Sequence, residues 1–324
     1  MVPGGRFLVT GATGLIGRHV IEQLLDHDCD GVTAGYRTAL PSAPDRRCDW
    51  RRADLADMEA CAALVAGHDT VIHCAGEIAP ATVLARDPVG PVRRNLAITG
   101  NIHEACWRAG VKKLVWFSST TGYPTDTDDL DEADMFRGDP PDGWYGLGWA
   151  HRYLETQSRM YAEKLSPALD VVALRPSLVY GPRDRVDPVA SHFVYTFVRR
   201  VLDREEPITV WGNGSQARDL IHARDVARAA LLAVASAKGY AAYNIAAGTT
   251  CTTREVLELL LAIDGWTDAR VRYEAPQGVS PVVTRRFLTA RAEREIGFRP
   301  EVGLEQGLRE LMAHTRLTTR ELAL

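Results

Sequence analysis

The sequence predicts an α/β protein, built as a doubly wound parallel sheet that carries a smaller C-terminal α/β cap. Two observations support this fold class. Short apolar runs alternate with longer helical patterns over residues 1–176, and a glycine-rich turn joins the first apolar run to the first helical pattern. Strand followed by helix, repeated along a chain, is typical of a parallel sheet with helices on both faces.

Five apolar runs in this part indicate buried strands, at 6–10, 31–36, 70–76, 113–119 and 170–176. Three stretches with apolar residues three or four apart indicate amphipathic helices, at 15–25, 92–109 and 148–165. Helices of this length can cross over the sheet between parallel strands. We therefore expect residues 1–176 to form one domain of the dinucleotide-binding type. This expectation depends on which residues form the turns between the strands and the helices.

After residue 176 the regular alternation of strand and helix patterns ends, and loops rich in glycine, proline and charged residues follow. Helical patterns separate these loops, at 189–204, 223–237 and 252–264. In the first of them an apolar residue every fourth position makes one stripe, formed by Val189, Phe193, Phe197 and Val201. We expect 177–324 to form mainly a substrate-binding cap, with part of 220–250 returning to the first domain and a ligand cleft between the two.

The composition is that of an ordinary globular protein. The 324 residues are 46% hydrophobic, and 42 acidic residues stand against 38 basic ones spread along the chain, which argues against a nucleic-acid or membrane partner. No apolar run approaches the roughly 18 residues that span a bilayer. The first strand begins too early for a secretion signal, and the six cysteines show no C-x-x-C spacing. We expect a cytoplasmic protein.

The stretch FLVTGATGLIG leads from the first strand into the first helix. Glycine there lets the backbone turn tightly and approach a pyrophosphate, whose charge is met by the free N–H groups of the helix. A purely structural turn is the alternative, but the strand before it and the helix after it favour a Rossmann-type cofactor site. The residues expected to touch the cofactor here are Gly11, Thr13, Gly14, Leu15, Ile16 and Gly17.

The next strand ends at AGYRT, where an NAD-preferring fold usually offers an acid to the adenosine ribose. The chain has Arg37 and no acid. A guanidinium suits a 2′-phosphate, so NADP is favoured over NAD, with a solvated surface arginine as the alternative. Asp54 follows the third strand and could meet the adenine amino group. A helix N-cap is the alternative for Asp54.

The chain resembles the extended short-chain dehydrogenases/reductases, also called the NAD-dependent epimerase/dehydratase family. The resemblance runs from end to end through TGATGLIG, ADL, VIHCAG, FSSTTGYP, LRPSLVYGPRD, WGNGSQARDLIHARDVA, YNIAAG and IGFRPEVGLEQGL. It implies a nucleotide-linked sugar that reacts through a transient keto form while hydride moves to and from a nicotinamide. It also implies cofactor contacts from Leu55, Ala75 and Pro176.

By the same resemblance, Ser119 in SSTTGY matches the hydroxyl that hydrogen-bonds the reacting sugar oxygen, and Thr121 should also touch substrate. A strand-end hydroxyl that caps a loop is the alternative for Ser119. Thr120 and Thr121 stand where 4,6-dehydratases place an Asp-Glu pair. Without those carboxylates no acid and base are evident for eliminating water, so 4,6-dehydration is disfavoured.

The family's Tyr-x-x-x-Lys pair is absent from GWYGLGWAHRYLE. Matching on Tyr145 puts Trp149 at the lysine position. Matching on Glu155 and Tyr161 puts Leu147 at the tyrosine and His151 at the lysine position, and we prefer this second alignment because its distance to LRP fits without an insertion.

His151 could hold a ribose hydroxyl, as a group that titrates near neutral pH without perturbation. Tyr145 could supply a displaced phenol from the loop that enters the helix. The alternative for His151 is a polar surface residue of the helix, and the alternative for Tyr145 is an aromatic residue that only packs.

Arg218 in SQARDLI matches the family's diphosphate-binding arginine, and a guanidinium can give a diphosphate two charge-assisted bonds. Its alternative is a structural ion pair with Asp219 or Asp225. The asparagine that many members carry after LRP is Leu178, which weakens the case for a diphosphate ligand. No H-x-x-x-H or His/Cys cluster is present, so we expect no metal site.

We therefore expect an NAD(P)-dependent epimerase or ketoreductase of nucleotide-sugar metabolism, with Ser119 polarising the reacting oxygen and Tyr145 or His151 supplying the proton. By the resemblance it would be a homodimer, joined through a four-helix bundle of the helices near 93–109 and 148–165. Two rivals remain open: a non-catalytic dinucleotide-binding sensor or scaffold, and unusual chemistry on a specialised metabolite.

Overall fold

The structure is a computed structural model that describes residues 4–77, 81–84, 86–125, 129–183, 193–274 and 285–322. Within these residues seven strands form one parallel sheet in the order β11-β7-β5-β4-β1-β2-β3. The strands are β1 (Arg6–Thr10), β2 (Gly31–Tyr36), β3 (Cys48–Arg52), β4 (Thr70–His73), β5 (Lys113–Phe117), β7 (Asp170–Pro176) and β11 (Tyr240–Ile245). The predicted doubly wound fold class is confirmed.

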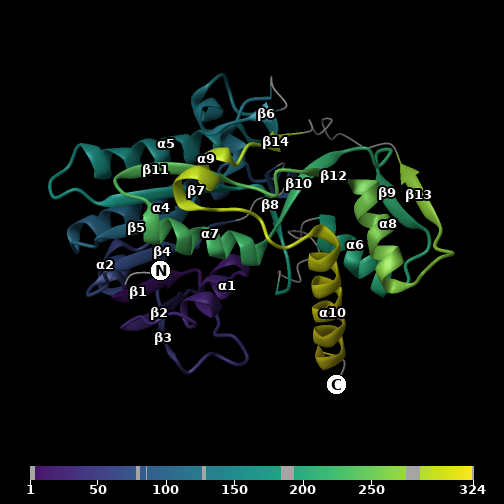
Figure 1. Cartoon of the computed structure of the whole chain (residues 1–324), viewed down its shortest axis with the longest axis horizontal. Helices are drawn as coiled ribbons and strands as arrows, with labels where there is room; N and C mark the ends of the chain where they lie inside the picture. The colour runs from purple at the N-terminus through teal and green to yellow at the C-terminus, as the bar shows by residue number, and fades with distance from the viewer. Residues whose placement is uncertain are drawn as a thin grey trace.

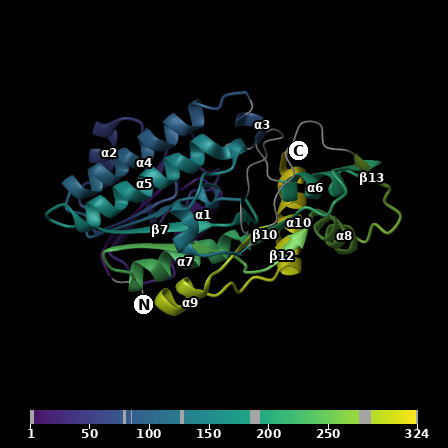
Figure 2. The ribbon, with the colours of Figure 1, turned by 90° about the horizontal axis from the view of Figure 1, so that it is seen from above.

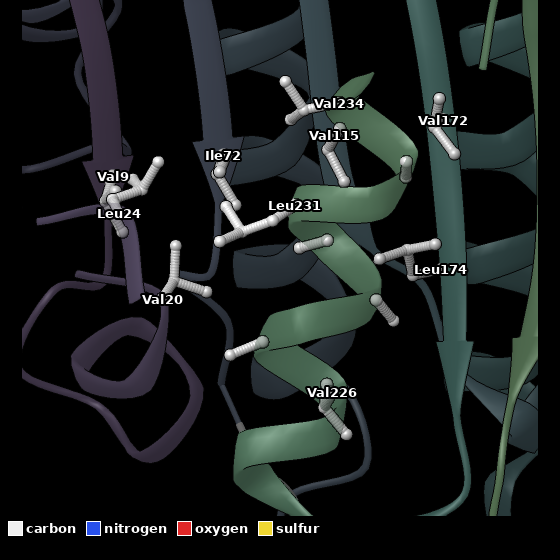
Figure 3. Packing of buried hydrophobic residues seen from close by; sticks show 14 of the residues in the cluster. Val9, Val20, Leu24, Ile72, Val115, Val172, Leu174, Val226, Leu231 and Val234 are labelled. Atoms are coloured by element: carbon white, nitrogen blue, oxygen red, sulfur yellow. The ribbon is translucent and has the colours of Figure 1, made fainter. Parts of the chain in front are cut away.

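Helices cover both faces of this sheet (Figures 1 and 2). One face packs against α2 (Met58–Val65), α4 (Gly90–Arg108) and α5 (Tyr145–Glu163). The other packs against α1 (Leu15–Leu24), α7 (Ala223–Ser236) and α9 (Ala290–Ile296). Figure 3 shows Leu231 and Val234 of α7 lying over Ile72 and Val115 of the sheet. Burial of these apolar faces is the main force that holds the layers together.

The side of the sheet on which the chain adds new strands changes between β1 and β4. After β1 it adds β2 and β3 on one side, and then returns to add β4, β5, β7 and β11 on the other. In open α/β sheets, ligands bind at the carboxyl ends of the strands at such a switch point. The glycine loop after β1 lies here, beside the chain that follows β4.

A smaller second part lies beside the sheet (Figure 1). Its strands are β8 (Leu178–Tyr180), β10 (Ala217–His222) and β12 (Thr250–Thr252) in one sheet, and β9 (Ile208–Trp211) with β13 (Val271–Glu274) in another. Its helices are α6 (Phe193–Leu202), α8 (Thr253–Asp264) and α10 (Leu304–Leu322), which share a separate apolar core. A two-stranded ladder, β6 (Asp129–Leu130) with β14 (Arg286–Phe287), lies above the central sheet.

Short helical elements lie in the connections of the first part. They are α3 (Ala81–Leu84) and the 3₁₀ turns η1 (Thr120–Gly122), η2 (Glu132–Phe136) and η3 (Asp142–Trp144). Although α7 and β11 come late in the chain, they belong to the central layers, because β11 pairs with β7 along its whole length.

Several predicted boundaries differ from the structure. α5 begins at Tyr145 rather than near 148, despite two glycines in its first turn. A Cβ on Gly148 would lie 2.7 Å from the Thr121 carbonyl oxygen, so glycine is needed there for the helix to approach the η1 turn. Phe197 and Val201 of the predicted apolar stripe are buried in α6, and Val189 lies outside the described residues.

Candidate functional site

The glycine loop forms a cradle that fits a dinucleotide phosphate. Gly11 has φ +64°, and a Cβ on it would lie 2.6 Å from the Ala75 backbone nitrogen. A Cβ on Gly17 would overlap the Gly11 carbonyl oxygen. Gly14 is the N-cap of α1 and no side chain caps the helix, so its first N–H groups remain available to an anion. Thr13 lies within this loop, and Leu15 and Ile16 form the start of α1.

The adenosine end of the cradle is defined by the ends of β2 and β3. Arg37 follows β2 and is exposed, and no acidic residue takes its place. Asp54 is also exposed, and its carboxylate accepts a 3.1 Å bond from the Ala56 N–H. The N-cap of α2 is Asp57, so the helix-cap alternative for Asp54 is wrong. Leu55 is buried, and its carbonyl accepts a 3.0 Å bond from Asn101.

Ser119 lies directly beyond β5, at the carboxyl edge of the sheet, and caps the η1 turn. Its Oγ accepts a 3.1 Å bond from the Thr121 N–H and a 2.9 Å bond from the Thr121 hydroxyl. Within the described residues no acceptor takes the Ser119 proton. Ser119 is therefore oriented as a hydrogen-bond donor, because Thr121 occupies its acceptor side.

Leu147 and His151, which the preferred alignment puts at the family's Tyr and Lys positions, share the inner face of α5. Leu147 is buried against Leu84 and packs with Trp144. His151 stacks on Trp116, with ring centroids 6.4 Å apart and an angle of 13° between the planes. In the preferred alignment, an apolar side chain therefore takes the position of the phenol.

His151 does not titrate near neutral pH, contrary to our expectation. Burial lowers the pKa of His151 to about 4, so the imidazole is neutral at pH 7. Its Nδ1 atom is buried, and nothing in the described part of the chain hydrogen-bonds to it. A buried N–H without an acceptor is less tolerable than a buried lone pair, so the proton belongs on Nε2. The surface-histidine alternative is also wrong.

Tyr145 lies away from these groups. It is the first residue of α5 and not part of a preceding loop, which corrects the prediction. Its ring packs edge-to-face on Trp149 at 6.4 Å, and 49% of the residue is exposed. Positions two apart on a helix point about 200° apart, so Tyr145 faces away from the side that carries Leu147.

A buried polar network beneath Ser119 was not foreseen from the sequence. Glu155 of α5 and Arg175 of β7 form an ion pair with bonds of 2.9 and 2.5 Å, and both side chains are at most 2% exposed. Ser118 donates a 2.6 Å bond to Glu155, and Arg175 donates a 2.7 Å bond to the Tyr123 hydroxyl. Helix, β5 end and β7 are thereby held together. No sequence signal marked Glu155, because Thr156, Gln157 and Ser158 follow it and only Leu154 beside it is apolar.

Arg218 on β10 is a half-buried cation without a counter-ion in the described residues. Its guanidinium lies 5.4 Å from the centre of the Phe193 ring, its Nη1 has no hydrogen-bond partner there, and burial lowers its pKa. The ion-pair alternative is wrong, because Asp219 accepts bonds from Ser177 and the Ala247 and Gly248 N–H groups. Asp225 instead pairs with Arg228.

Arg285 is a second such cation, and sequence reasoning missed it. It is half-buried, burial lowers its pKa, and no group in the described ranges forms an ion pair with it. It directly precedes β14, which contacts β10, the strand that carries Arg218. A basic residue in a run of two arginines was the only sequence signal.

The glycine loop at the switch point, the Ser119 hydroxyl at the carboxyl edge of the sheet and the cap arginines without counter-ions in the described residues fit a Rossmann-type dinucleotide enzyme. A model of the NAD dependent epimerase/dehydratase family matches residues 7–246, so the chain belongs to this family. The resemblance predicted from the motifs is confirmed, and with it the expectation of an NAD(P)-dependent enzyme.

The chain is similar to several known proteins over nearly its whole length. It is 30% identical to the dTDP-4-dehydro-6-deoxy-D-allose reductase of Streptomyces bikiniensis, with 97% of this chain and 98% of that protein covered. The UDP-glucose 4-epimerase of Thermotoga maritima, solved with UDP-glucose, has a TM-score of 0.85 and 26% identity, with 97% and 99% of the two chains covered. The UDP-glucose 4-epimerase of Thermus thermophilus, solved with NAD, has a TM-score of 0.79 and 29% identity, with 96% and 99% covered.

The part of the chain that the structure describes has neither a candidate metal site nor a candidate membrane-spanning helix. This part contains no group of three or more His, Cys, Asp or Glu side chains placed to hold a metal ion. None of its helices has the length and apolar character needed to cross a membrane.

Proposed function

We propose that the protein is an NAD(P)-dependent epimerase or ketoreductase that acts on a nucleotide-linked sugar through a keto intermediate. The observation that supports this most is Arg218, a half-buried guanidinium with no counter-ion among the described residues. Leaving such a charge without a partner is unfavourable unless a ligand supplies the anion. A sugar linked to a nucleoside diphosphate supplies it, and Arg285 is a second candidate ligand for the same group.

The proposed roles of the glycine loop, Ser119 and Thr121 are as follows. Gly11, Gly14 and Gly17 cradle the cofactor pyrophosphate at the start of α1. A bound nicotinamide supplies or accepts the hydride, which no protein side chain can do. Ser119 donates its proton as a hydrogen bond to the reacting sugar oxygen, and Thr121 orients that donor and lines the substrate side.

His151 contributes a neutral hydrogen bond rather than a positive charge. In this proposal its Nε2–H holds a ribose hydroxyl, as lysine does in the family, but without the electrostatic effect that would activate a phenol. To the remaining predicted residues we assign further contacts with the cofactor: Asp54 and Leu55, which follow β3, with the adenine, and Ala75 and Pro176, near the ends of β4 and β7, with the rest of the cofactor. Tyr145 is not given a catalytic role, because it faces outward on α5.

NADP is the cofactor we favour. Arg37 at the end of β2 offers a cation where a carboxylate would favour the ribose of NAD, and no acid follows that strand. The cap would comprise 177–324 without α7 and β11.

A homodimer is the assembly we favour. The outer face of α5 exposes three large apolar side chains, Trp149 at 42%, Tyr153 at 60% and Met160 at 39%, next to α4. Packing α4 and α5 against a second copy would bury this face in a four-helix bundle. Light scattering should therefore show twice the chain mass, and Tyr153→Glu should shift the protein toward a monomer. A monomeric wild type would contradict this assembly.

One observation favours a second candidate, a non-catalytic dinucleotide-binding protein. Leu147 is packed in an apolar cluster where the family's proton donor belongs. Such a protein would bind cofactor but would have no need for an unpaired arginine in the cap. Binding of a nucleoside diphosphate that Arg218→Met abolishes would therefore favour the enzyme.

The experiment starts from denatured protein, from which any released nucleotide is identified by chromatography. The emptied protein is then titrated with NADPH, NADH, UDP, GDP and dTDP, alongside Arg218→Met. Retained NAD would favour a self-recycling epimerase, and an empty protein that prefers NADPH would favour a reductase. Failure to bind either dinucleotide would overturn the proposal, and a diphosphate affinity that Arg218→Met leaves unchanged would overturn the role of Arg218.

A further inference from the structure

The carboxyl ends of β2 and β3 bring two arginines together. Arg37 directly follows β2, and Arg52 is the last residue of β3, paired in register with Tyr36. The Nε of Arg52 donates a 3.0 Å hydrogen bond to the Arg37 carbonyl oxygen. This bond holds the Arg52 guanidinium against the backbone of Arg37.

The two arginines differ from their neighbours in charge compensation. Arg47 pairs with Asp45 at 2.8 Å, and Arg51 pairs with Asp49 at 2.7 Å. Within the described residues no carboxylate lies at ion-pair distance from Arg37 or from Arg52. The strand end thus carries two positive charges without local partners.

We infer that Arg52 is a second determinant of cofactor choice, acting with Arg37 as a clamp for the 2′-phosphate of NADP. The inference rests on the proposed function, because it assumes that a dinucleotide binds at the glycine loop. That loop follows β1, the strand next to β2, and in this type of fold the end of β2 lies beside the adenosine ribose.

The chemistry of Arg52 suits this role. Because its Nε is engaged by the Arg37 carbonyl, the two terminal nitrogens remain free to donate a pair of bonds to one phosphate. A 2′-phosphate carries about two negative charges near neutral pH, as phosphate monoesters do, and would be attracted by both positive charges at this strand end. The neutral ribose hydroxyls of NAD would offer neither effect.

The test measures dissociation constants by calorimetry for NADPH, NADH, 2′,5′-ADP and 5′-ADP. The variants are Arg52→Gln, Arg37→Gln and Arg52→Lys, with Arg51→Gln as the matched control on the same strand. Arg52→Gln should reduce the preference for NADPH over NADH about tenfold and weaken 2′,5′-ADP to the same extent, leaving 5′-ADP and NADH within about twofold. Arg51→Gln should change none of these values. Arg52→Lys should recover part of the loss, because it keeps the charge but not the Nε–H that bonds to the Arg37 carbonyl.

Each other outcome would overturn the inference. An unchanged NADPH preference in Arg52→Gln, with loss in Arg37→Gln, would assign the 2′-phosphate to Arg37 alone. A wild-type preference for NADH would refute the clamp while leaving an NAD-dependent enzyme standing. Binding of neither dinucleotide would instead mean that the proposed function itself fails. Thermal unfolding of each variant separates lost binding from lost folding, and both side chains are exposed, so we expect unchanged midpoints.

Discussion

Replacing Glu155 by glutamine should strongly destabilise the fold, because it leaves the buried Arg175 without its counter-ion. Arginine cannot shed its proton to escape a low-dielectric site. The variant amide can still accept the bond that Ser118 now gives to the carboxylate. The loss is therefore mainly electrostatic, and breaking a buried ion pair by removing one partner costs about 3–5 kcal/mol.

The magnitude can be checked by urea unfolding and by thermal melting. For a chain of this size about 2 °C per kcal/mol is expected, so Glu155→Gln should lower the melting temperature by about 6–10 °C. Arg175→Met should cost less in acid than at neutral pH, because the stranded carboxyl can then bind a proton. The double variant should be more stable than the sum of the single losses predicts, by about 2 kcal/mol or more.

Two results would refute this reasoning. If Glu155→Gln costs less than about 1 kcal/mol, the ion pair does not compensate a buried charge. If the two single losses add up in the double variant, the carboxylate and the guanidinium are not energetically coupled.

Three further predictions concern the site and its surroundings. Ser119→Ala should lower kcat/KM about a hundredfold while leaving NADPH affinity unchanged, and a residual rate above about a tenth would remove Ser119 from the chemistry. Gly17→Ala should abolish dinucleotide binding, since its Cβ would overlap the Gly11 carbonyl oxygen; Gly303→Ala, whose added Cβ would have nothing within 4 Å, is the control that should retain binding. Burial lowers the pKa of His103 to about 4, so the folded chain binds fewer protons than the unfolded chain below about pH 6.5. The stability that comes from keeping His103 neutral is therefore complete above that pH, and the free energy of unfolding falls by about 3 kcal/mol as the pH falls toward 4. His103→Gln should flatten the dependence of urea stability on pH over that window.

The sequence alone determined the elements whose cause is local. Strand and helix periodicity reflects which side chains face a core, so β1, β2 and β7 were predicted at their observed bounds. The glycine loop was equally clear, because a Cβ on Gly11 would lie 2.6 Å from the Ala75 nitrogen and one on Gly17 would overlap the Gly11 carbonyl oxygen. The family followed from the order of its motifs along one chain.

Local pattern could not determine where α5 begins. Two glycines and an aromatic at its start argue against a helix by propensity. The contact of Gly148 with the Thr121 carbonyl and with Pro140 overrides that preference, because packing against the η1 turn determines where the helix starts. Tyr145 consequently moved from an expected loop to an outward-facing helical position.

Charge compensation was decided only by tertiary structure. From the sequence, an ion pair of Arg218 with Asp219 or Asp225 remained the alternative to a diphosphate contact, and His151 could titrate near neutral pH. Folding directs Asp219 to Ser177, which is 42 residues away along the chain, and buries His151 against Trp116. Whether a charge is partnered or buried depends on residues that are distant in sequence, and therefore no local pattern reveals it.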